Sequence, residues 1–249
     1  MSYQIRLWRR PQPGLIYGIG GDVAEGLPDG DDSVYEVLRA DTKEQCCEVW
    51  GKIPPVEFGE LGLILGLWYN KALIGIENNK DLTPLHVLNE MGYENIYKER
   101  RESKLAWKQF TAKMGWNTNT LTRRPLVNRG RRALTDGAQV IYSHELWQQW
   151  HTFVLLHGKY QAMPGAHDDG VMAYLIASEM CDVALQRDPE GGEQTEERDT
   201  FAAWSNAPLT DFGQHMRQRV QRNIDKTMEE QHDKTDEALE YALTDRGDY

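Results

Sequence analysis

The stretch Leu15–Gly21 reads LIYGIGG and is followed directly by Asp22. Its apolar, glycine-rich composition is typical of a buried β-strand. The segment Ser33–Arg39 (SVYEVLR) alternates its side chains as a second strand would, and the turn-forming sequence GLPDGDD separates the two. Residues 45–52 fit either a third strand or the start of a helix. The sequence therefore predicts that the domain begins with a near-continuous run of strands.

Helices and strands alternate after this run. The residue patterns predict helices at residues 57–71, 83–91 and 167–185, and short strands at residues 72–76, 95–97 and 140–142. A run of strands followed by such alternation favours an α/β fold with a mixed sheet. We expect this domain to end near residue 185.

Composition divides the chain into four segments. Residues 1–14 form a basic, proline-containing lead-in, and residues 15–186 form the folded domain. Residues 187–207 have the composition of a linker. Residues 208–249 are highly charged and carry apolar residues at every fourth position from 212 to 228, which predicts a helical, acidic tail.

The chain shows neither a membrane span nor a secretory signal. No apolar run approaches 18 residues, and the basic N-terminus lacks an apolar core. The three cysteines, Cys46, Cys47 and Cys181, are odd in number and have no metal-ligand spacing. We expect them to be reduced thiols of a cytosolic protein.

The net charge of −11 at first argues against a nucleic-acid partner, because phosphate contacts need lysine and arginine. The charge is unevenly distributed, however. Residues 182–249 hold 17 acidic and 8 basic residues, whereas residues 98–132 hold 11 basic and 2 acidic ones. This second stretch, called the basic segment below, also carries Trp116, and an aromatic among basic residues suits a DNA backbone.

We therefore predict that the basic segment contacts DNA phosphates, although charge runs more often form a solvated helix face. No motif that reads bases in the major groove is visible, so little sequence specificity is expected. The candidate DNA-binding residues are Lys98, Arg100, Arg101, Lys104, Lys108, Arg123, Arg124, Arg129, Arg131 and Arg132.

Acidic residues occur at the ends of two predicted strands and at the start of a predicted helix. Asp22 and Glu77 each follow an apolar strand, and the pair Asp168 and Asp169 opens an apolar helix. Functional groups gather at the carboxyl ends of strands in α/β sheets, and converging carboxylates need a cation to cancel their repulsion. The pattern is consistent with a site for Mg²⁺, although single acids at such places are more often turn formers or helix caps. By the same reasoning Glu25, Asp29, Asp31 and Asp32 are expected to be solvated turn residues.

Four stretches of the chain resemble the motifs of phage large-terminase nuclease domains. They are GDVAEG (21–26), IGIENN (74–79), KLAWKQFTAKMGWNTNTLTRRPLV (104–127) and PGAHDDGVMA (164–173). The similarity spans about residues 15–180, and the motifs stand in the order of the family. The resemblance implies an RNase H-like fold, in which helices flank a mixed central sheet.

The resemblance also implies a chemistry, which is the cutting of concatemeric viral DNA during genome packaging with two Mg²⁺ or Mn²⁺ ions. Carried over to this chain, Asp22 bridges both ions and Glu77 holds one. Asp169, with Asp168 close by, holds the other, and the sequence does not say which of the two is the direct ligand. His167 is expected near the scissile phosphate, or else as a helix-start histidine that contacts backbone.

One departure narrows this hypothesis. The phosphate-binding pattern GxxxxGK[ST] of an ATPase motor is missing, so we expect an excised or separately encoded nuclease. The implied partners are double-stranded DNA and the ATPase motor, portal or small terminase subunit, in the cytoplasm of an infected host cell. The alternatives are another RNase H-like nuclease, such as a junction resolvase, and a non-catalytic module that binds DNA or packaging partners.

Overall fold

The protein is described by a computed structural model that covers residues 3–27, 29–101, 111–137 and 139–187. Five further residues are described, at 214, 217, 218, 221 and 222, and they are helical. By compactness the chain divides into two units, Met1–Leu209 and Thr210–Tyr249. The first unit contains all the named helices and strands, so the fold and the site are those of this unit.

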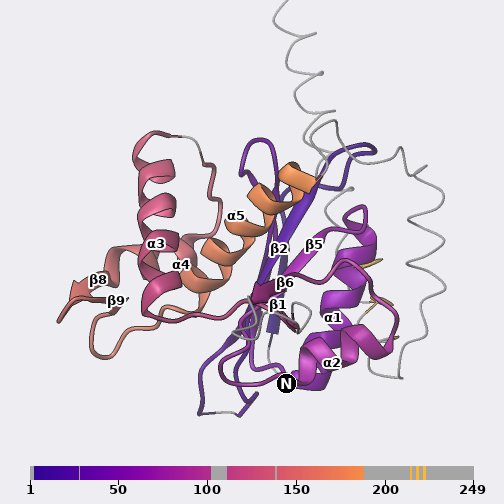
Figure 1. Cartoon of the computed structure of the whole chain (residues 1–249), viewed down its shortest axis with the longest axis horizontal. Helices are drawn as coiled ribbons and strands as arrows, with labels where there is room; N and C mark the ends of the chain where they lie inside the picture. The colour runs from indigo at the N-terminus through magenta and orange to yellow at the C-terminus, as the bar shows by residue number, and fades with distance from the viewer. Residues whose placement is uncertain are drawn as a thin grey trace, which may run out of the picture. The chain divides into compact units, whose positions relative to one another are not determined.

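A five-stranded mixed sheet forms the centre of the first unit (Figure 1). Its strands follow the order β1-β4-β3-β2-β5, in which β2 and β5 are parallel and the other neighbours are antiparallel. The strands are β1 (Tyr3–Leu7), β2 (Tyr17–Asp22), β3 (Ser33–Arg39), β4 (Gln45–Gly51) and β5 (Leu73–Ile76). The predicted α/β fold with a mixed sheet flanked by helices is confirmed.

Strand β4 settles a question that the sequence left open, and strand β1 was not predicted. Residues 45–52, for which the sequence left strand and helix open, contain strand β4. Part of the lead-in, Tyr3–Leu7, forms the edge strand β1, which pairs with β4 along its whole length. Tyr3, Ile5 and Leu7 alternate with Gln4 and Arg6 as in a half-buried strand, so the assignment of the whole stretch to a lead-in overlooked a pattern that the sequence carries.

Helix α5 (Asp169–Arg187) covers one face of the sheet, and α1 (Pro55–Trp68) and α2 (Thr83–Glu90) lie on the other (Figure 1). The approach of α5 to β2 depends on glycine. A Cβ atom on Gly20 would lie 2.0 Å from the carbonyl oxygen of Ala173, inside α5. On the opposite face the ring of Tyr35 stacks on that of Phe58 in α1 at 3.8 Å. The sheet is therefore buried on both faces, as near-continuous apolar strands require.

The basic segment contributes a hairpin and a helix. The hairpin consists of β6 (Lys98–Arg101) and β7 (Thr111–Met114), and the helix is α3 (Thr120–Thr135). Asn119 caps α3 by accepting from the backbone N–H groups of Leu121 and Thr122. Helices α3 and α4 (His144–Thr152) pack against the outer side of α5 (Figure 1). The hairpin of β8 (Phe153–Leu156) and β9 (Lys159–Ala162) packs in turn on α3 and α4.

The core contains a pair of acidic side chains besides its apolar residues. Glu36 on β3 and Glu48 on β4 stand directly opposite each other, and both are fully buried. Glu36 accepts a hydrogen bond from Gln45 at 2.8 Å, and Glu48 pairs with Arg6 on β1. Burial, followed by the charge of the facing Glu48, raises the pKa of Glu36.

Three smaller predictions concern two short strands, the cysteines and membrane-spanning helices. The short strands predicted at 95–97 and 140–142 are reduced to single bridges, Ile96 to Ile74 and Val140 to Glu44. Cys46, Cys47 and Cys181 are buried and form no disulfide. Within the described part of the chain, no helix is both long and apolar enough to cross a bilayer.

Candidate functional site

The ends of β2 and β5 bring Asp22 and Glu77 together. The two strands run parallel, with Gly21 in register with Ile76. The backbone N–H of Glu77 then donates to the carbonyl oxygen of Gly21 at 2.9 Å, which fixes Glu77 beside the last residue of β2. Both side chains are buried, with Asp22 5% and Glu77 8% exposed. Two neighbouring strands thus deliver two carboxyl groups to one edge of the sheet, as predicted.

The first residue of α5 supplies the third carboxyl group. Asp169 is 6% exposed, and its charge is one of those that act on Asp22. The start of the helix is held in place because Gln149 on α4 accepts hydrogen bonds from the backbone N–H groups of Gly170 and Val171. The acids that the sequence placed at two strand ends and a helix start therefore converge.

The electrostatics of this group show an excess of buried negative charge. The pKa of Asp22 lies well above its usual range because of burial and then because of the charges of Glu77 and Asp169. Burial, followed by the charge of Asp31, raises the pKa of Asp169 to about 6. Converging carboxylate oxygens with uncompensated charge are the donor set that a hard divalent cation prefers.

Asp168 lies in a different environment from its neighbour Asp169. Its carboxylate forms an ion pair with Arg123 of α3, and its backbone carbonyl accepts from the N–H of Met172 in the first turn of α5. Arg123 in turn donates through Nε to the carbonyl oxygen of Tyr160 on β9 at 2.8 Å. The structure therefore distinguishes the two aspartates: Asp169 belongs to the buried acidic group, and Asp168 is paired with a cation.

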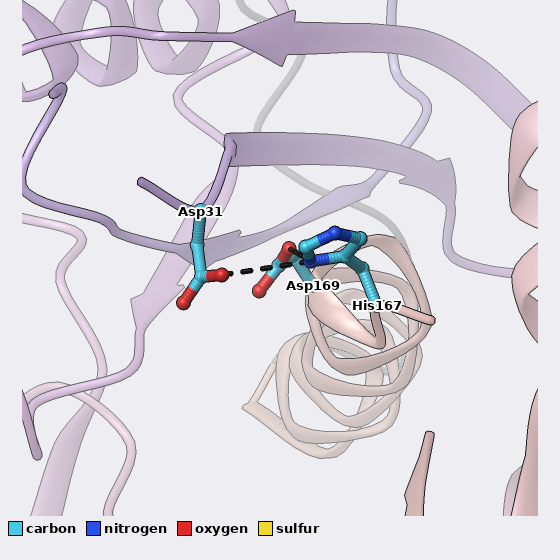
Figure 2. Close-up of side chains that lie close together, drawn as sticks. All are labelled: Asp31, His167 and Asp169. Atoms are coloured by element: carbon cyan, nitrogen blue, oxygen red, sulfur yellow. Dashed lines mark ion pairs between the residues drawn. The ribbon is translucent and has the colours of Figure 1, made fainter. Parts of the chain in front are cut away.

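The structure adds Asp31 to the site, a residue that we expected to be a solvated turn residue. Asp31, His167 and Asp169 offer ligand atoms that all lie within 4.8 Å of one another (Figure 2). His167 Nδ1 lies 3.5 Å from Asp31 Oδ1 and 3.9 Å from Asp169 Oδ2. The loop from β2 to β3 leaves from the end of β2 at Asp22, so it lies at the same sheet edge. That topological signal was already available in the sequence.

A lysine also contributes to this site. Lys80 Nζ lies 3.5 Å from Asp31 Oδ2. Burial opposes its charge, but the surrounding carboxylates, Asp22 and Asp169 foremost, raise the pKa of Lys80 overall. Lys80 follows β5 by only a few residues and so shares the sheet edge. Sequence reasoning missed it because it searched for acids and not for the cation that partly balances them.

A cleft of about 400 Å³ lies beside the acidic group. Its lining includes Glu77 and Asn79 on one side, and Arg123, Arg124, Lys159 and Tyr160 on the other. Arg124 and Lys159 are exposed, and neither has a carboxylate partner among the described residues. The cleft thus places positive charge next to the site. Lys159 lies outside the basic segment, and its place in the cleft results from the β8–β9 hairpin packing on α3.

The other candidate DNA-binding residues are scattered. Arg129 pairs with Glu179 of α5, and Arg131 approaches the hydroxyl of Tyr160 at 3.4 Å. Arg132 lies on α3, and Lys98, Arg100 and Arg101 lie on β6. Lys104 and Lys108 fall outside the described residues.

Comparison with solved structures finds proteins that share this architecture. The large terminase nuclease from thermophilic phage G20c matches with a TM-score of 0.53 and 17% identity, over 70% of this chain and 87% of that one. The chain has the fold of the large-terminase nucleases. The same phage nuclease with bound magnesium matches with a TM-score of 0.55 and 17% identity, over 70% of this chain and 86% of the other.

The large terminase nuclease domain of Thermus phage P74-26 gives a TM-score of 0.51 with 18% identity, over 70% of this chain and 83% of that one. No protein-family model matches the chain, and no curated protein matches it in sequence. The resemblance to large-terminase nucleases that the sequence motifs indicated is therefore confirmed by the three-dimensional fold.

Proposed function

We propose that this chain is a metal-dependent endonuclease that cuts double-stranded DNA by phosphodiester hydrolysis with low sequence specificity. The observation that carries the proposal is the convergence of three buried carboxyl groups, those of Asp22, Glu77 and Asp169, beside a cleft whose lining includes Arg124 and Lys159, two cations without a carboxylate partner among the described residues. Carboxylates from separated chain segments on rigid elements hold divalent ions well, and cations bind the substrate's phosphates.

The ligand roles follow from the resemblance to large-terminase nucleases. Asp22, whose carboxyl group interacts with both other acids, would be the ligand shared by two ions, and Glu77 and Asp169 would hold one each. Asp31 and His167 extend the donor set on the side of Asp169. When bound, Mg²⁺ or Mn²⁺ ions activate the attacking water and neutralise charge on the leaving oxygen.

The protein's own residues position the DNA for this chemistry. Arg124 and Lys159 bind backbone phosphates in the cleft. His167 is 61% exposed in its side chain and lies at the entrance of the acidic group, so it can approach the scissile phosphate.

The fold supports the biological setting of the proposal. The similar structures are nucleases of phage large terminases, and those of phage G20c were obtained with bound magnesium, cobalt and zinc. We propose that this chain cuts concatemeric viral DNA during genome packaging, in the host cytoplasm. An ATPase motor, a portal or a small terminase subunit would be its partners there.

Plasmid cleavage tests the proposal directly. The full chain should nick and cut supercoiled DNA with Mn²⁺ or Mg²⁺, and chelator or Asp22→Asn should abolish the reaction. Lys43→Met, which removes a cation paired with Asp182 away from the site, is the matched control and should cut normally. Cleavage that survives in Asp22→Asn would refute the site, and a preference for four-way junctions over linear duplex would indicate a resolvase.

A further inference from the structure

Arg123 stands between the acidic group and the cleft. Its Nη2 pairs with Asp168, which directly precedes Asp169, and its side chain also lines the cleft. The guanidinium is anchored independently of Asp168, because Nε donates to the carbonyl oxygen of Tyr160 and the group lies 5.9 Å from the centre of the Phe153 ring. Arg123 can therefore change the partner of its terminal nitrogens without leaving its place.

In the absence of DNA, this pair keeps Asp168 away from a metal ion. The Asp168 side chain is 25% exposed and the Arg123 side chain 16%, so the pair is sheltered from solvent and weakly screened. A carboxylate bound to arginine is a poor metal ligand, since both cations compete for the same oxygens. The acidic group then has Asp22, Glu77 and Asp169 as its buried carboxyl ligands.

A DNA phosphate in the cleft would compete for Arg123. The planar guanidinium binds phosphate oxygens as well as it binds carboxylates, and Arg124 and Lys159 attract the phosphate to the same place. We propose that a backbone phosphate of bound DNA takes over the terminal nitrogens of Arg123, so that Asp168 is released to a divalent ion only when DNA is present. This inference rests on the proposed nuclease function and adds a coupling between substrate and metal.

The coupling has a measurable consequence. If DNA frees a ligand for the metal, then DNA strengthens metal binding, and metal strengthens DNA binding by the same factor. A factor of about ten is expected, within the usual range for coupled sites. The metal site of the nuclease would thus be complete only when DNA is bound.

The test measures Mn²⁺ binding to the full chain by calorimetry, with and without a short duplex whose phosphorothioate linkages resist cutting. In the unaltered protein the duplex should strengthen Mn²⁺ binding about tenfold. In Asp168→Asn the affinity without DNA should stay within about twofold, and the larger part of the gain on adding DNA should disappear, since only the phosphate oxygens then add to the ion. In Arg123→Met the affinity without DNA should rise towards the DNA-bound value, because Asp168 is already free.

The matched control is Lys43→Met, which removes a cation that pairs with Asp182 of α5 and does not line the cleft. It should retain the tenfold coupling, which excludes a general effect of charge. If Arg123→Met does not fold, Arg123→Lys takes its place in the test. This variant keeps the charge and removes the planar guanidinium, so it should retain part of the coupling.

Two results would overturn the inference in distinguishable ways. A protein that binds Mn²⁺ and cuts DNA, but keeps its coupling in Asp168→Asn, refutes the exchange at Arg123 and leaves the nuclease intact. A protein that binds no Mn²⁺ and cuts no DNA refutes the proposed function, and the inference with it.

Discussion

Glu77 donates its backbone N–H to the carbonyl oxygen of Gly21 at 2.9 Å, so the carboxyl groups of Asp22 and Glu77 lie at the ends of two neighbouring parallel strands. Both side chains are buried, and burial, followed by the charge of Glu77, raises the pKa of Asp22. Two carboxyl groups held in this way share a proton more readily than they tolerate two charges. In the metal-free protein the carboxyl groups therefore repel one another, and a bound cation would remove this repulsion.

Replacing Asp22 by asparagine should stabilise the metal-free protein and abolish its response to metal. The amide removes a buried carboxyl group whose ionisation is opposed by burial and by the charges of Glu77 and Asp169, so the free energy of unfolding at pH 8 should rise by roughly 1–2 kcal/mol. Thermal unfolding with and without Mg²⁺ measures both effects. A variant that Mg²⁺ still stabilises as much as the parent would contradict the assignment of Asp22 as shared ligand.

The stability of the metal-free protein should fall as the pH rises from about 4 to about 6. The pKa of Asp169 is raised to about 6 in the folded state, so the folded protein binds more protons than the unfolded chain in this window. The contribution is fully present below the unfolded pKa and is lost as the pH passes the folded pKa. Its size is on the order of 3 kcal/mol or less.

Urea unfolding across this pH range, in chelator, tests the direction. Asp169→Asn should flatten the dependence in the same window, and Glu25→Gln in the neighbouring loop should not. Metal affinity should show the opposite trend and rise with pH, since protons compete with the ion for the same oxygens. A stability that increases between pH 4 and 6 in the parent, and does so equally in Asp169→Asn, would show that Asp169 is not the group.

Gly20→Ala should destabilise the fold strongly. The added methyl group would lie 2.0 Å from the carbonyl oxygen of Ala173 and 2.2 Å from the backbone nitrogen of Ala177, and helix backbone cannot move aside as a side chain can. The expected loss is at least about 3 kcal/mol, measured by urea unfolding. Gly30→Ala is the control, because its nearest neighbour lies at 3.5 Å, and it should change stability by less than about 0.5 kcal/mol.

DNA binding should depend on salt through the cleft. Each phosphate contact contributes about 0.9 to the slope of log K against log salt, so Arg124→Met with Lys159→Met should lower this slope by about 2. Fluorescence anisotropy with a labelled duplex in chelator measures it without cutting. Lys43→Met, whose lysine is paired with Asp182 away from the cleft, should leave the slope unchanged. An equal loss in both proteins would show that the cleft holds no phosphate.

Substitutions in the buried pair of Glu36 and Glu48 should change the stability of the protein in opposite directions. Glu36→Gln should stabilise the protein by about 1 kcal/mol at pH 8, because the amide removes the need for a shared proton beside Glu48. Glu48→Gln should destabilise it by about 1–2 kcal/mol, because Arg6 loses its buried partner.

The pH dependence separates this explanation from simple repacking. Burial raises the pKa of Glu36 in the folded state, so the parent loses stability as the pH rises, and the advantage of Glu36→Gln should grow from pH 5 to pH 8. Thermal unfolding at both pH values provides the measurement. An advantage that is the same at pH 5 and pH 8 would contradict the shared proton.

The sequence by itself indicated three of the five strands, β2, β3 and β5, and the principal acids. Apolar runs end at Asp22 and Glu77, and an apolar helix begins at Asp169. These patterns depend only on neighbouring residues, so they can be recognised without knowing the tertiary structure. The edge strand β1 alternates apolar and polar residues as a half-buried strand does, but its place in a basic, proline-containing stretch led to its assignment as a lead-in. Helix α3, which contains Pro125, escaped it because its many basic residues mask its apolar face.

Only the tertiary structure decided which groups meet. The pairing of Arg123 with Asp168 joins residues 45 positions apart, and Lys159 enters the cleft because a hairpin packs on α3. Asp31 joins His167 and Asp169 because its loop returns to the same sheet edge. Local patterns cannot fix such contacts, since each depends on the packing of elements that are distant in the chain. The sequence therefore indicated the acids of the site, and the fold separated Asp169 from Asp168 by giving the latter to an arginine.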